Sequence, residues 1–122
     1  MTMEELYQKG IELWETAEQI MKHDKISSSE ARKQMISYQK QAVECWLQSA
    51  EQGYAKAQYQ LGHYYYHYGR NNNKNKKAFE WYSKAAEQGY ALAQYELGFL
   101  YTYGAGVPMN RKMSHYWYEK AA

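Results

Sequence analysis

Small and apolar residues recur at helical spacing along most of the chain. In residues 55–68 and 76–88 the clearest series are Ala57, Leu61, Tyr65 and Tyr68, then Phe79, Tyr82 and Ala86. Steps of three and four residues place such side chains on one face of an α-helix. The pattern therefore predicts pairs of helices, each with one buried face.

The same pattern is repeated at an offset of 36 residues. The tetrapeptide Glu-Gln-Gly-Tyr occurs at 51–54 and again at 87–90. The offset also carries Ala57, Gln58, Tyr59, Leu61 and Gly62 onto Ala93, Gln94, Tyr95, Leu97 and Gly98, and Trp81, Tyr82, Ala85 and Ala86 onto Trp117, Tyr118, Ala121 and Ala122. A period between 20 and 50 residues is typical of stacked supersecondary units. The sequence thus predicts a repeat protein.

Glycine marks the predicted helix ends. Gly53 and Gly89 follow the second helix of a unit, where a residue with positive φ ends a helix at least cost. In the third unit the segment Gly-Ala-Gly-Val-Pro at 104–108 ends the first helix, and Asn110 is a suitable N-cap for the next.

Two further glycines, Gly62 and Gly98, fall inside predicted helices. Glycine in a helix costs about 1 kcal/mol relative to alanine. Its recurrence at one repeat position therefore predicts a close approach of the partner helix, with Ala85-Ala86 and Ala121-Ala122 as the matching small surface.

These residues resemble the Sel-one-like repeats, a branch of the tetratricopeptide-like helical solenoids. The third unit carries the resemblance most fully, with Ala-Gln-Tyr-Glu-Leu-Gly at 93–98, Tyr101, the 104–108 loop, Trp117-Tyr118 and Ala121-Ala122. The second unit keeps Leu61-Gly62, Tyr65, Ala78, Trp81-Tyr82 and Ala85-Ala86 but has Gly-Arg-Asn-Asn-Asn at 69–73 in place of the family's glycine-valine loop. The resemblance implies an all-α superhelix.

The first unit is a degenerate copy. Tyr7 to Gly10 aligns with Tyr59 to Gly62, and Cys45-Trp46 replaces Trp81-Tyr82. Gly10 to Cys45 spans 35 residues against 19 from Gly62 to Trp81, so we expect both helices to be longer, with a turn at 23–29 and a capping box from Ser27 to Glu30. The chain is expected to form one domain, 1–122, with units of about 3–54, 55–90 and 91–122.

Composition excludes several classes. The net charge is +2, from 15 basic and 13 acidic residues mixed along the chain, so no large field favours nucleic acid or anionic lipid. The amino terminus lacks the pattern of a secretory signal and no apolar run reaches membrane length, which favours a cytoplasmic protein. A single cysteine, Cys45, excludes an intrachain disulfide and separates the chain from disulfide-rich secreted relatives.

The 15 tyrosines are the unusual feature. A helical wheel centred on Leu61 places a set of side chains on the opposite face, with equivalents in the other two units. In proteins that this chain resembles, the first helices of successive units line the concave side. We therefore expect a partner-binding groove formed by Tyr7, Trp14, Lys56, Tyr59, His63, Tyr66, His67, Tyr95, Phe99 and Tyr103. The alternative is that these rings pack between adjacent units.

Other candidate chemistry is weak. His63 and His67 have the spacing of a zinc pair, but no third ligand is evident, and no metal or cofactor is predicted. Cys45 is interpreted as a small buried residue because no base for a nucleophile can be identified. Glu51, Glu87 and Glu96 are interpreted as solvated repeat positions. The 104–106 loop follows no strand, which argues against a phosphate-binding loop.

The resemblance implies a non-catalytic module that binds another protein. A more specific form of this hypothesis is an immunity protein that occludes a bacterial toxin. An enzymatic alternative is hydrolysis of β-lactam rings, assigned to some disulfide-rich relatives, but the lone cysteine and missing triad argue against it. A structural alternative is self-association through the carboxyl-terminal unit.

Overall fold

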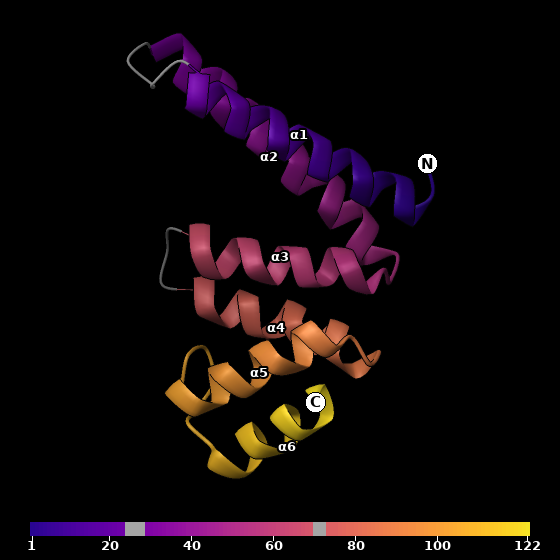
Figure 1. Ribbon diagram of the computed structural model, residues 1–122, viewed down its shortest axis with the longest axis vertical. Helices are drawn as coiled ribbons and strands as arrows, with labels where there is room; N and C mark the ends of the chain where they lie inside the picture. The colour runs from indigo at the N-terminus through magenta and orange to yellow at the C-terminus, as the bar shows by residue number, and fades with distance from the viewer. Residues whose placement is uncertain (24–28, 70–72) are drawn as a thin grey trace.

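The computed structural model describes residues 1–23, 29–69 and 73–122, and these residues form six α-helices. The helices are α1 Met3–His23, α2 Ser29–Glu51, α3 Ala55–Tyr68, α4 Lys74–Glu87, α5 Ala91–Tyr103 and α6 Arg111–Ala121. Consecutive helices pack in pairs, α1 with α2, α3 with α4 and α5 with α6, and the pairs stack from one end of the molecule to the other (Figure 1). The predicted all-α superhelix is confirmed. In the described part of the chain, no helix combines the length and apolar character needed to cross a membrane.

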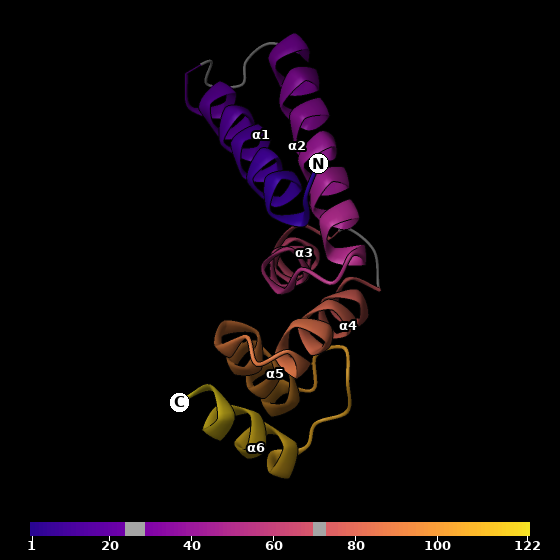
Figure 2. The same ribbon diagram turned by 90° about the vertical axis from the view of Figure 1, so that its right-hand side faces the viewer.

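The first pair is longer than the others, as predicted. Helices α1 and α2 have 21 and 23 residues, whereas α3 to α6 have between 11 and 14. Figures 1 and 2 show this hairpin projecting beyond the stack formed by α3 to α6. Residues 24–28 of the expected turn, which include Ser27 of the expected capping box, and residues 70–72 of the loop lie outside the described residues.

The helix ends follow the predicted local chemistry. Gly53 and Gly89 have φ of 96° and 91°, and Gly104 ends α5 with φ of 66°. The Asn110 side chain accepts a hydrogen bond of 3.1 Å from the backbone N–H of Met113 at the start of α6. Helix α4 begins at Lys74, two residues earlier than the expected Lys76.

The two helix glycines give close helix approach, but the expected partner surface was wrong. A β-carbon on Gly62 would lie 2.6 Å from Cδ1 of Tyr82, and one on Gly98 would lie 2.7 Å from Cδ1 of Tyr118. Each glycine therefore faces the ring of a tyrosine, not an alanine pair. Gly10 stands in the same relation to the indole of Trp46, which supports the alignment of the degenerate first unit.

Among the described residues, two clusters rich in alanine form most of the buried core. The first contains Ala42, Trp46, Ala50, Ala57 and Leu61, and the second contains Ala78, Tyr82, Ala85, Ala86, Ala93, Leu97 and Leu100. The partly buried Tyr65 packs against both clusters. Small residues let the helices approach closely, and Trp46 and Tyr82 supply much of the buried volume.

Glutamine side chains tie successive pairs together. Nε2 of Gln58 donates to the carbonyl of Ala50, and Nε2 of Gln94 donates to the carbonyl of Ala86, both at 3.2 Å. Gln88 donates to the carbonyl of Gly53 at 2.9 Å and to Oε1 of Gln58 at 2.8 Å. The bonds from Gln58 and Gln94 satisfy carbonyls in the last turns of α2 and α4. The sequence analysis did not assign them, although the recurrence of Gln58 at Gln94 was their signal.

Candidate functional site

A series of ring contacts crosses from α3 to α5. His63 and His67 have ring centroids 4.3 Å apart, and His67 lies 5.0 Å from Tyr66. Tyr66 in turn lies 6.1 Å from Phe99 on α5, and Phe99 lies 4.8 Å from Tyr103. We call these five residues the aromatic face. Tyr103, at its end, is 67% exposed.

Other members of the predicted groove pack between successive units. Tyr7 lies 5.7 Å from Tyr54, and Tyr59 lies 5.3 Å from Tyr90. Burial raises the pKa of both Tyr7 and Tyr59. In each case the contacting tyrosine is the residue immediately before the next helix, so these two rings help to hold the repeat stack together.

Trp14 belongs to a separate aromatic cluster. Its ring contacts Trp46 at 5.6 Å, Tyr64 at 5.9 Å and Tyr68 at 5.1 Å. Tyr68 had been placed with the apolar residues of its helix, yet it is half exposed. Helical periodicity did not predict this cluster, because Trp14 belongs to α1 whereas Tyr64 and Tyr68 belong to α3.

Two predicted groove residues remain outside these clusters. Lys56 is exposed at the start of α3. Tyr95 is 53% exposed and lies 5.3 Å from Tyr118 of the same unit. Tyr95 is thus more open than its repeat equivalent, Tyr59.

Glu96 was interpreted as a solvated position, and this was wrong. Its side chain is partly buried, and burial raises its pKa, an effect partly offset by His67. Burial also lowers the pKa of His63, with a smaller contribution from His67. The Glu96 carboxylate is therefore within electrostatic reach of His67. Among the described residues, however, no group of three histidine, cysteine or acidic side chains could hold a metal ion.

The Tyr82 hydroxyl lies beneath this region. Tyr82 is 1% exposed and its hydroxyl has no hydrogen-bond partner among the described residues. Burial raises its pKa strongly, and the charge of Glu96 adds to the effect. Tyr82 is therefore a neutral core residue and not a candidate acid or base at neutral pH.

Cys45 is not the fully buried residue expected. Its side chain is partly exposed, at the repeat position occupied by Trp81 and Trp117. The small thiol of Cys45 covers less of the neighbouring helix surface than an indole ring at this position would.

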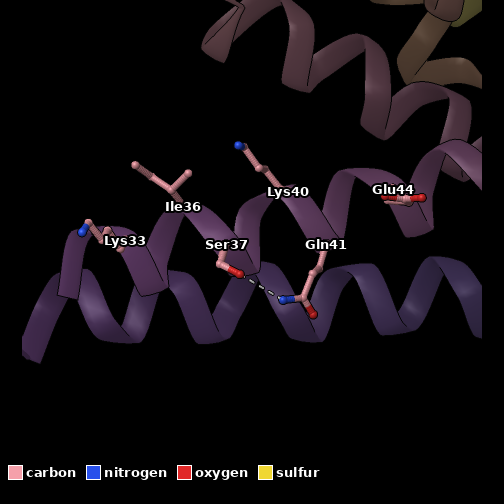
Figure 3. Close-up of a pocket in the computed structure, with 6 residues that line it drawn as sticks. All are labelled: Lys33, Ile36, Ser37, Lys40, Gln41 and Glu44. Atoms are coloured by element: carbon pink, nitrogen blue, oxygen red, sulfur yellow. Dashed lines mark hydrogen bonds between the residues drawn. The ribbon is translucent and has the colours of Figure 1, made fainter. Parts of the chain in front are cut away.

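A hollow of about 360 Å³ also lies along α2. Figure 3 shows Lys33, Ile36 and Lys40 projecting along one side of the helix, with Gln41 donating to Ser37 Oγ at 3.2 Å and Glu44 further along. The lining comes from one helix and carries both charges. Such an open surface with mixed charges does not indicate any particular class of ligand.

The repeat geometry agrees with a known family. The Sel1 repeat model matches residues 37–54, 55–90 and 91–122. The chain belongs to the Sel1 repeat family. Sel1 repeat proteins are generally protein-interaction modules. The first match begins within α2, in agreement with the lengthened and divergent first hairpin.

Two solved structures are similar to this Sel1 repeat chain. A Sel1 repeat protein from Oxalobacter formigenes is 34% identical with a TM-score of 0.63, over 68% of this chain and 63% of that one. The protein c5321, a protective antigen present in uropathogenic Escherichia coli strains and displaying an SLR fold, is 32% identical with a TM-score of 0.64. That similarity covers 93% of this chain and 22% of c5321. The chain thus spans less than two thirds of either protein. Among curated proteins, none matches it.

Proposed function

We propose that this Sel1 repeat chain is a non-catalytic module that binds a protein partner across the aromatic face. The observation that carries the proposal is the ring series from Tyr66 through Phe99 to the exposed Tyr103, which joins two repeats in one surface. Aromatic side chains offer large contact area with little loss of conformational entropy, and they are enriched at the energetic centres of interfaces.

Glu96 supports a partner with a basic side chain at this surface. Its carboxylate is partly buried, and within the described residues it forms neither a hydrogen bond nor an ion pair. An unpaired carboxylate in such surroundings gains when a cation approaches it. Aromatic rings nearby favour lysine or arginine further through cation–π contact. A partner that presents such a side chain satisfies both features.

The test is affinity capture with mass spectrometry, followed by a binding constant for the captured partner. The Tyr66→Ala/Tyr103→Ala double variant should weaken binding about thirtyfold or more, which corresponds to roughly 2 kcal/mol for one aromatic anchor. Tyr116→Ala is the matched control, because Tyr116 is an exposed tyrosine of α6 outside the aromatic face. Unchanged binding by the double variant would show that the partner uses another surface.

A further inference from the structure

A histidine pair forms the α3 end of the aromatic face. His63 and His67 are one turn apart on α3, and their ring centroids are 4.3 Å apart. His63 is partly buried, whereas His67 is exposed. Histidine is the side chain whose ordinary pKa lets its charge change between about pH 5 and 8. This end of the aromatic face therefore gains positive charge in mild acid.

Helix α5 brings a negative charge to the same surface. Glu96 precedes Phe99 by one turn, and a spacing of three residues places both side chains on one face of the helix. Phe99 lies 6.1 Å from Tyr66 of α3, and Tyr66 lies 5.0 Å from His67. The charge of His67 favours the ionised form of Glu96 and lowers the pKa of that carboxyl. The contact between α3 and α5 thus couples the carboxylate to the histidine pair.

His67 is the member of the pair that takes up a proton first. Burial lowers the pKa of His63, and the charge of His67 lowers it further. Within the described residues, His67 is the one group whose charge acts on the pKa of His63. The other titratable groups at this surface are Tyr59 of α3 and Tyr82 of α4, and burial raises the pKa of both, which keeps them neutral. The charges that change in mild acid are therefore those of His67 and Glu96.

We propose that a proton on His67 competes with the partner's basic side chain for the Glu96 carboxylate, so that the aromatic face binds its partner at neutral pH and releases it in mild acid. In acid the imidazolium supplies a cation to Glu96 from within the chain, and the same charge repels an approaching lysine or arginine. Both effects weaken binding of a basic partner. The inference rests on the proposed function, because it concerns the cation that the partner presents to the aromatic face.

The first test needs no partner. The side-chain carboxyl carbon of Glu96 is followed by NMR between about pH 3 and 8 in the parent chain and in His67→Gln. The pKa of Glu96 should be higher in the variant, because the positive charge that favours its carboxylate has been removed. His115→Gln is the matched control, since Nε2 of His115 lies 2.8 Å from Oε1 of Glu119 and the titration of Glu96 should not change. If His67→Gln left the titration of Glu96 unchanged, the proposed competition would be absent.

The second test uses Nα-acetyl-arginine amide, a probe whose guanidinium is its only charge. Its dissociation constant is measured at about pH 7.5 and pH 6.0 from the shifts of the Glu96 and Phe99 amide signals. Binding to the parent chain should be at least about threefold weaker at the lower pH, on the scale of a partly screened ion pair. The ratio of the two dissociation constants should fall close to one in His67→Gln. Nα-acetyl-citrulline amide, a neutral probe of similar shape, should show no such dependence on pH.

Three outcomes of the second test contradict the proposal. Equal binding of the arginine probe at both pH values would remove the acid effect, and an equal ratio in the parent chain and His67→Gln would assign that effect to another group. Absence of saturable probe binding near neutral pH would show that Glu96 receives no cation. Failure of the proposed function has a different signature, which is unchanged partner binding by the Tyr66→Ala/Tyr103→Ala variant. That variant retains both His67 and Glu96.

Discussion

Gly98 of α5 faces the ring of Tyr118 on α6, and a β-carbon at position 98 would lie 2.7 Å from Cδ1 of that ring. The pair Gly62 and Tyr82 has the same relation one repeat earlier. Since real side chains do not approach so closely, the helix pair must separate or the ring must move when a methyl group is added. Gly98 thus fixes the spacing of the third repeat.

Gly98→Ala should therefore destabilise the fold by about 1–3 kcal/mol, because overpacking forces side chains from their preferred rotamers. Chemical denaturation followed by circular dichroism measures the change. In a Tyr118→Leu background the cost should be smaller, and a double-mutant cycle isolates the interaction. Equal costs in both backgrounds would mean that Tyr118 does not limit the approach of the helices.

Gln94→Leu should cost about 1 kcal/mol of stability, because it removes a buried hydrogen bond to the carbonyl of Ala86, which still accepts from the backbone N–H of Gly89. Thermal or urea unfolding provides the measurement. Gln52→Leu is the control, since Gln52 is exposed and its hydrogen bond of 3.4 Å to the carbonyl of Gln48 is local. A similar loss in both variants would argue against a special role for the bond between repeats.

Tyr65→Ala should lower stability by roughly 1–3 kcal/mol, because Tyr65 packs against both core clusters and its truncation leaves a cavity. Tyr103→Ala should leave Tm nearly unchanged, since its ring is 67% exposed. Melting curves of the two variants compare the rings directly. If Tyr103→Ala were the more destabilised variant, Tyr103 would be a packing residue and a poor candidate for partner contact.

Glu96→Gln should raise Tm at neutral pH. The folded state raises the pKa of Glu96 above its ordinary value of 4.5, chiefly through burial. The favourable contribution of its neutral form is therefore present below pH 4.5 and is lost as the pH rises through the folded pKa. Glutamine stays neutral throughout and occupies the equivalent position 60.

The gain in Tm from Glu96→Gln should accordingly disappear on acidification below pH 4.5. Glu87→Gln, at an exposed position, should change Tm little at either pH. A gain for Glu96→Gln that did not depend on pH would indicate a cause other than burial of the charge.

The sequence by itself determined the repeat, its helix pairs and most helix ends. Those features depend on local chemistry: the period of 36 residues, the positive φ adopted by Gly53, Gly89 and Gly104, and the N-cap of Asn110. It also predicted the lengthened first hairpin from the insertion between Gly10 and Cys45. Each of these features depends either on a few neighbouring residues or on the alignment of one repeat with the next. A single sequence is therefore enough to predict them.

Tertiary structure alone decided how the faces of different helices meet. The wheel placed Tyr7, Tyr59 and Tyr66 together opposite the core. In the stack, Tyr7 and Tyr59 are partly buried against the tyrosines that precede α3 and α5, whereas Tyr66 contacts Phe99. Packing between repeats also leaves Glu96 partly buried, whereas the sequence had predicted a solvated position. The physical reason is that the burial of a side chain on the outer face of a helix depends on how the neighbouring repeat packs against it. The periodicity of a single helix carries no information about that packing.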